Sequence, residues 1–206
     1  VSASPHQQTL RQTSLSTRFN TACFGVLGYE LDLKFLTYVE KKEIKEQIAF
    51  YKKYRHIFQF GTFSLVKTHK DNQSFWQCSD RSTALTGFFQ NTAKSADSAA
   101  CLTVKGMDPA SFYKTETKPQ RLFIKRFGGL VKHLLPFSLD PDGFILKTAN
   151  KYYALADCVE TYTASGALLD YGILLNNQFM GTYYNNRTQL LGDFGSYLFV
   201  TKKIAS

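Results

Sequence analysis

Two carboxylates near the start of the chain are the residues best placed to do chemistry. Glu30 and Asp32 directly follow an apolar run over residues 22–29. Residues two apart in an extended segment share one face, and a retaining glycosidase needs two carboxylates about 5 to 5.5 Å apart across the bond that it breaks. A single pair after a strand is common, however, so a structural role for Glu30 and Asp32 is favoured over catalysis.

Other patterns that could hold a ligand lack essential partners. Residues 140–143 read Asp-Pro-Asp-Gly but have no closing glutamate, so a tight turn is favoured over a calcium loop. The histidines and cysteines do not have the spacing of metal ligands. The sequence therefore predicts no metal site, no cofactor and no catalytic residue within the chain.

Aromatic side chains are the remaining candidates for ligand binding, because sugar rings stack on exposed aromatic faces. Tyr183 and Tyr184 precede an Asn-Asn turn, which favours a surface position and makes them candidates for substrate binding. Trp76 lies within an alternating segment, and a place in the core is favoured for it.

The elements that would position Glu30 and Asp32 are a strand and the helix after it, which resemble half of a repeating unit of a parallel α/β fold. The run over residues 22–29 predicts a strand buried on both faces. Thr37 and Glu40 then have the spacing of a capping box, and apolar residues recur at helical spacing behind it. A lone strand and helix cannot complete a parallel sheet, so either neighbouring strands precede Val1 or the segment packs unusually.

From residue 60 onward the pattern changes to short alternating segments broken by turns. They predict strands over 62–68, 74–78, 83–90, 100–105, 121–127, 144–148, 152–157 and 197–202. Strands at this spacing without helices between them indicate a mainly β fold, an antiparallel β-sandwich of Greek-key type.

Composition supports a folded, strand-rich protein, since hydrophobic residues make up 44% and aromatic residues 15% of the 206 positions. The net charge of +9 suggests a polyanion ligand, but many basic residues alternate with glutamates on the predicted helix, as on a solvated face. Nucleic-acid binding is therefore ranked below the other two hypotheses for the function, which are given below. The cysteines are scattered, which favours free thiols over two disulfides. No signal peptide and no membrane span are predicted.

Several stretches, taken in order, resemble the C-terminal part of α-galactosidases of glycoside hydrolase family 36. Phe24-Gly-Val-Leu-Gly-Tyr-Glu-Leu-Asp32 is similar to that family's last barrel strand. Residues 43–55 and 58–63 are similar to the helix that follows and to the exit into the C-terminal domain, and Gly192-Asp-Phe-Gly-Ser196 is similar to the segment before the final strand.

The resemblance implies retaining hydrolysis of terminal α-galactosides such as melibiose or raffinose on a (β/α)8 barrel, usually in a cytoplasmic oligomer. The family's nucleophile lies in a Lys-Trp-Asp motif and its acid/base in a Ser-Asp-Asp motif, and neither motif occurs here. Both catalytic aspartates would therefore precede Val1. The rim segment also departs from the family's Pro-Asn-His-Gln, since it reads Pro-His-Gln-Gln over residues 5–8.

We therefore expect two regions. Residues 1–59 would be the remnant of a (β/α)8 barrel, namely a loop, the last strand and the last helix, and residues 60–206 an antiparallel β-sandwich. The intact parent would be a cytoplasmic α-galactosidase, whereas this fragment would be inactive, would cap the barrel and would self-associate. The alternative is a stand-alone β-sandwich that binds carbohydrate. No nucleic acid and no membrane are expected as partners.

Overall fold

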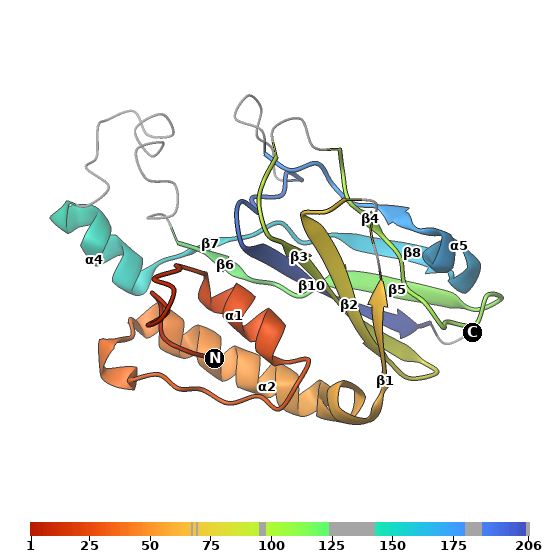
Figure 1. The fold of residues 1–206 in the computed structure, drawn as a ribbon, viewed down its shortest axis with the longest axis horizontal. Coiled ribbons are helices and arrows are strands. Elements are labelled where there is room, and N and C mark those ends of the chain that lie inside the picture. Colours follow the sequence, from red (N-terminus) through yellow and green to blue (C-terminus); the bar gives the residue numbers. More distant parts are fainter. Residues whose placement is uncertain (67, 69, 95–97, 124–142, 180–186, 205–206) are drawn as a thin grey trace.

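A six-stranded sheet forms the centre of the structure, a computed structural model that describes residues 1–66, 68, 70–94, 98–123, 143–179 and 187–204. Its strands follow the order β1-β2-β3-β10-β5-β8, and every neighbouring pair is antiparallel (Figure 1). The strands are β1 (Thr62–Val66), β2 (Gln73–Ser79), β3 (Thr83–Gln90), β5 (Phe112–Thr117), β8 (Thr161–Ser165) and β10 (Gly195–Lys203).

Shorter elements surround this sheet. Two further antiparallel pairs join β4 (Cys101–Leu102) to β9 (Ile173–Leu174) and β6 (Arg121–Leu122) to β7 (Leu155–Ala156). The helices are α1 (Leu15–Ala22), η1 (Leu33–Phe35), α2 (Tyr38–Phe60), α4 (Phe144–Tyr152) and α5 (Gly166–Tyr171). The mostly antiparallel architecture predicted from the sequence is confirmed. The Greek-key sandwich is not confirmed, because the described strands form one large sheet and two short pairs.

Both faces of the central strands β3 and β10 are buried, and the side chains on these two faces, which alternate along each strand, enter different cores. Phe88 of β3 and Phe199 of β10 lie in a core with the segment 100–107 and α5. Leu85 and Leu198, on the opposite face of the same two strands, pack against α1 and α2. Figure 1 shows α1 and α2 side by side along the sheet. One sheet thus joins two hydrophobic cores.

Helix α2 begins at the capping box predicted from the sequence. The Thr37 hydroxyl accepts from the amide of Glu40 at 3.2 Å, and the Glu40 carboxylate accepts from the amide of Thr37 at 2.8 Å. These bonds satisfy backbone donors that have no partner inside the helix. Ile44 and Tyr51 are buried as their helical spacing requires. The helix spans 23 residues and ends at Gly61.

The strand predicted over residues 22–29 is absent, and this prediction was wrong for the structure. Residues 15–22 form α1 instead, where the Ser14 hydroxyl accepts from the amide of Thr17 at 3.0 Å and caps the helix. Residues 23–32 are turns and irregular backbone, and Val26 is 88% exposed. A buried parallel strand exists only between hydrogen-bonded neighbours, and among the described residues no strand pairs with this run.

The strand predicted over residues 144–148 was also wrong, because this segment is the first part of α4. Its apolar residues are consecutive and fit either period, so periodicity alone does not separate strand from helix. Phe144 and Tyr152 are 84% and 70% exposed, and α4 contacts α2. The strands predicted over 62–68, 74–78, 83–90 and 197–202 correspond to β1, β2, β3 and β10.

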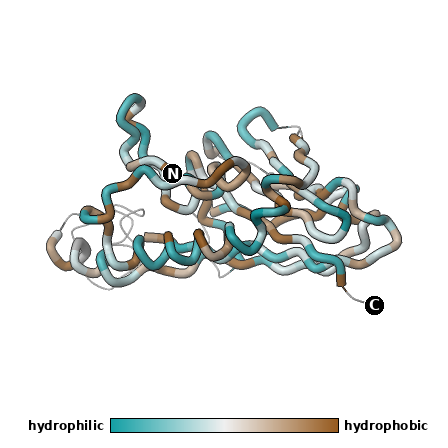
Figure 2. Tube along the Cα trace, turned by 90° about the horizontal axis from the view of Figure 1, so that it is seen from below, coloured by the Kyte–Doolittle hydropathy of each residue, from teal (hydrophilic) through white to brown (hydrophobic). Residues whose placement is uncertain are grey.

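Hydrophobic and hydrophilic residues are interspersed along the chain rather than gathered in one long apolar stretch (Figure 2). Among the helices that the structure describes, none has the length and apolar character needed to cross a membrane.

Candidate functional site

An open pocket of about 720 Å³ lies between the N-terminal segment and one end of the large sheet. Residues 1–30 supply most of its wall, and the ends of β3 and β10 supply the rest through Phe89 and Gly195. Sequence reasoning did not find this pocket, because its two walls are far apart in the chain.

The wall of the pocket carries more positive than negative charge. Arg11 lies over the ring of Phe194, with 4.4 Å from its guanidinium carbon to the ring centroid. Arg18 donates to the carbonyl of Ser2, and burial lowers the pKa of its guanidinium group. Glu30 is the single carboxylate among the described lining residues. A retaining glycosidase needs two carboxylates, so these residues do not form a glycosidase centre by themselves.

Val1 binds the segment after the apolar run in a specific pattern. Its amino group donates to the carbonyl of Gly28, and its carbonyl accepts from the amide of Glu30 at 3.0 Å. In a pair of parallel strands, each bonded residue forms its two hydrogen bonds with the residues just before and just after the residue opposite it. The backbone at Tyr29 is therefore aligned with Val1 as parallel strands are, although no strand forms.

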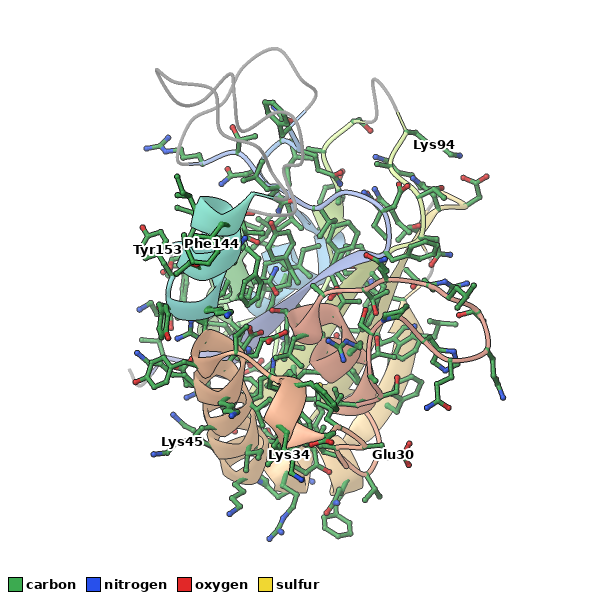
Figure 3. All side chains as sticks on the ribbon, turned by 90° about the vertical axis from the view of Figure 1, so that its left-hand side faces the viewer. Glu30, Lys34, Lys45, Lys94, Phe144 and Tyr153 are labelled. Carbon is green, nitrogen blue, oxygen red and sulfur yellow. The ribbon has the colours of Figure 1, made fainter. Side chains whose placement is uncertain are left out.

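The structure separates the roles of the two predicted carboxylates. The Asp32 carboxylate accepts from the amide of Lys34 at 2.9 Å and caps η1, which is a structural role. Glu30 lines the pocket, and Figure 3 shows it at the periphery of the molecule. The preference for a structural role thus agrees with the contacts of Asp32, whereas Glu30 remains available to a ligand.

A cluster of aromatic rings lies next to the pocket and holds the start of the irregular segment. The ring of Phe24 meets those of Phe58 and Trp76 edge-on, at centroid distances of 5.4 and 5.9 Å. Trp76 also lies 4.7 Å from Phe89. Trp76 therefore packs against other aromatic rings but is only partly buried, so it lies at the margin of the core that the sequence favoured for it.

A buried polar network links α1, α2 and the irregular segment. The Glu43 carboxylate accepts from the Ser16 hydroxyl at 2.7 Å and from the Gln47 amide at 2.9 Å. The Tyr29 hydroxyl donates to Gln47 at 2.9 Å. Burial raises the pKa of Glu43, and the hydrogen bond from Ser16 and the charge of Lys118 oppose that shift. Burial of Glu43 thus makes its ionised form less favourable than that of a carboxylate in water.

Protonation of Glu43 is expected to change stability. Because its pKa is raised in the folded state, its favourable contribution is fully present below the unfolded value of about 4.3 and is lost as the pH rises through the folded value. Glu43→Gln imitates the protonated form, so its free energy of unfolding relative to wild type should increase from about pH 4 to about pH 7. Urea unfolding at several pH values measures this difference.

Glu116→Gln is the control for that experiment, because Glu116 lies on the surface beside Lys114 at 2.8 Å. Its effect should be small at every pH, as for other exposed pairs. A difference between Glu43→Gln and wild type that does not vary with pH would contradict the role of burial.

Two buried carboxylates that sequence reasoning missed lie close together in the chain. Glu160 is 5% exposed, and its carboxylate accepts from the Gln189 amide at 2.5 Å, from the backbone amide of Asn176 at 2.9 Å and from the Tyr162 hydroxyl. Asp157 accepts from the Gln120 amide at 3.0 Å. Apart from Tyr162, these donors are distant in sequence, so the spacing of residues along the chain does not reveal the site. The groups that donate to these two carboxylates are neutral and hold neighbouring loops in place, which indicates a structural role.

The four cysteines are free, as the sequence favoured. Cys23 and Cys78 are buried, and burial raises the pKa of the Cys78 thiol to about 11. Cys101 is exposed. Within the described ranges, no group of three acidic, histidine or cysteine side chains is placed to hold a metal ion. The candidate sugar-binding residues Tyr183 and Tyr184 lie outside the described residues, as do residues 140–142.

Comparisons with known proteins relate both the sequence and the fold to one group of enzymes. Residues 1–61 match the Melibiase family model. The chain is 41% identical to alpha-galactosidase AgaA of Geobacillus stearothermophilus over 119 residues, which are 56% of this chain and 16% of that protein. It is 38% identical to alpha-galactosidase 1 of Pediococcus pentosaceus over 117 residues, again 16% of the relative.

Solved structures extend the likeness over the remaining residues. The crystal structure of AgaA from Geobacillus stearothermophilus, assigned to glycoside hydrolase family 36, matches 99% of this chain and 21% of its own, with 28% identity and a TM-score of 0.65. An AgaA variant solved in complex with raffinose matches with a TM-score of 0.66. The alpha-galactosidase from Lactobacillus brevis matches 100% of this chain and 22% of its own, with 26% identity and a TM-score of 0.67.

Proposed function

This chain is a relative, in sequence and in fold, of the α-galactosidases of glycoside hydrolase family 36, and from that premise we propose that it forms one part of such an enzyme. The intact enzyme would release terminal galactose from α-galactosides such as melibiose or raffinose with retention of configuration. Both catalytic aspartates would lie outside this chain, which would be inactive alone.

The observation that carries this proposal is the extent of the structural match. The chain matches a solved α-galactosidase over 99% of its own length but only 21% of the enzyme's length. The pocket supports the same conclusion, since retaining hydrolysis needs two carboxylates and the described lining offers only Glu30. The alignment of Val1 with Tyr29 supports a parallel neighbour for this segment in the intact enzyme.

The proposed role of the chain is to complete and cap a barrel. Residues 1–59 would supply its last helix and the segment over residues 22–29, which would become a strand only beside parallel neighbours of the intact enzyme, and residues 60–206 would form the antiparallel domain that covers the barrel. Packing supports close cooperation between these regions, because α1 and α2 share a core with β2, β3 and β10. The same antiparallel domain would take part in oligomer contacts.

An assay of hydrolysis tests the proposed function. The purified chain should release nitrophenol from a nitrophenyl α-galactoside only at background rate. A related α-galactosidase shortened by the segment that matches this chain should also be inactive, and mixing the two should restore hydrolysis. Turnover by the chain alone at enzyme rates, about 1 s⁻¹ or more, would place the catalytic groups within it and refute the proposal.

Self-association is a further expectation for the isolated chain. Val26, Phe35 and Tyr38 are 88%, 85% and 66% exposed, and they lie in or next to the segment that would face the missing barrel. Apolar side chains gathered in this way favour contact with a second surface. Sedimentation velocity should show a weight-average mass that rises with concentration, and that rise should diminish in Val26→Ser/Phe35→Ser. A concentration-independent monomer would contradict the expectation.

A cytoplasmic location is part of the proposal. Four free cysteines are consistent with a reducing compartment, where thiols are not driven to pair. The exposed Cys101 in particular would be prone to oxidation outside such a compartment.

A further inference from the structure

One aromatic side chain of the irregular segment touches three strands of the sheet. The ring of Phe24 lies 6.4 Å from that of Phe63 on β1, 5.9 Å from that of Trp76 on β2 and 6.2 Å from that of Phe89 on β3. The Phe58 ring of α2 completes the enclosure at 5.4 Å. These four rings meet Phe24 edge-on, the favourable arrangement for aromatic pairs. We name them the aromatic socket.

A glycine in β3 makes room for this contact. A Cβ atom at position 87 would lie 2.8 Å from the Phe24 ring and 2.7 Å from the Phe89 ring, closer than carbon atoms pack. Gly87 faces Trp76 across β2 and β3. The sheet therefore has a gap in its side-chain layer where the Phe24 ring enters.

Beyond Phe24, the segment is attached by hydrogen bonds to α2 and by Leu27 and Tyr29, which are half-buried against the core shared by α1, α2 and the sheet. The Tyr51 hydroxyl donates to the carbonyl of Gly25 at 2.9 Å, and the Tyr29 hydroxyl donates to Gln47 at 2.9 Å. Val26 and Glu30 are exposed. Phe24 is thus the aromatic contact of this segment with β1, β2 and β3, and the far end of the segment carries Glu30 into the pocket wall.

We infer that Phe24 is a positioning residue through which the aromatic socket of the sheet fixes the path of residues 25–32. This inference rests on the proposed function for its catalytic consequence: the antiparallel domain would set the position of the last barrel strand, and with it the pocket wall that carries Glu30. The antiparallel domain would then tune activity without touching substrate.

Amide hydrogen exchange of the isolated chain tests the physical step. In Phe24→Ala, exchange of the hydrogen-bonded amides of Leu27 and Glu30 should accelerate by about two orders of magnitude, because the contact that holds their segment against the sheet is lost. Phe24→Leu should show an intermediate effect, and Gly87→Ala should also accelerate exchange, since its new methyl group displaces the ring. The matched control is Phe75→Ala, which removes a buried ring from the opposite face of β2.

Equal exchange of residues 25–32 in Phe24→Ala and Phe75→Ala would overturn the inference, because the effect would then reflect general loss of stability. If Phe24→Ala does not fold, Phe24→Leu and Gly87→Ala give the same comparison. Emission of Trp76, the only tryptophan of the chain, reports directly on the aromatic socket. It should change in the Phe24 and Gly87 variants.

The activity restored by mixing tests the catalytic consequence. With the mixture saturated in the added chain, Phe24→Ala should lower kcat/KM by about tenfold, Phe24→Leu should recover part of the loss, and Phe75→Ala should match wild type once folded. If the wild-type chain restores no activity, the proposed function fails. If Phe24→Ala restores activity as well as wild type does, the positioning role fails while the proposed function stands.

Discussion

Replacing Glu160 with alanine is expected to lower the free energy of unfolding by about 4 kcal/mol, because it leaves buried donors without an acceptor. The Gln189 amide, the Asn176 backbone amide and the Tyr162 hydroxyl all donate to this carboxylate, which is 5% exposed. Each unsatisfied buried donor costs about 1 to 3 kcal/mol. Urea unfolding followed by circular dichroism measures the loss.

Glu160→Gln is the matched variant, and its effect should be far smaller, about 1 kcal/mol. Its amide oxygen can still accept from Asn176 and Tyr162, while its NH₂ group would face Gln189. Among the residues that the structure describes, the Gln189 side-chain oxygen has no hydrogen-bond partner, so this amide can turn over and accept from the new donor. Equal losses for the alanine and glutamine variants would show that the hydrogen bonds are not what Glu160 contributes.

Phe199→Ala is expected to cost about 4 kcal/mol, the range measured for deletion of a buried phenylalanine ring. Phe199 is fully buried, and its strand β10 pairs with both β3 and β5. Phe112→Ala on β5 is the control, since Phe112 is 59% exposed and little contact is removed. Thermal and urea unfolding should separate the two variants clearly. Comparable losses of unfolding free energy in Phe199→Ala and Phe112→Ala would contradict the central place of β10.

The sequence predicted best those elements whose pattern is decided locally. β3 was predicted with both ends in place, because a short segment rich in apolar residues follows the Asp80-Arg81-Ser82 turn. The start of α2 was predicted from its capping box, which needs only residues three apart. In both cases neighbours in sequence supply the deciding contacts.

The elements that were missed depend on distant partners or unusual cores. β5 was overlooked because its buried positions include Thr115 and Thr117, whose hydroxyl groups hide the alternation. The hydroxyl of Thr115 bonds to that of Thr201 at 2.9 Å, a partner that no local pattern reveals. The run over residues 22–29 has the composition of a buried strand, but a strand also needs pairing.

The candidate site was predicted only in part for the same reason. Glu30 was singled out from the segment that carries it, and it does line the pocket. Phe89 and Gly195 enter the same wall only through the sheet, and the burial of Glu160 depends on Gln189. Which residues face one another across a pocket follows from tertiary packing, which spacing alone does not encode.

The position of β10 within the sheet has a consequence for how the protein is made. This strand comes late in the sequence, yet it separates β3 from β5 and contributes to both hydrophobic cores. During synthesis, β1, β2 and β3 emerge from the ribosome long before the strand that must cover their open edge. Until residues 195–203 have been synthesised, β3 exposes unpaired backbone groups and an apolar surface to other nascent chains. The risk of aggregation, and with it the need for chaperones, would therefore be greatest during this interval.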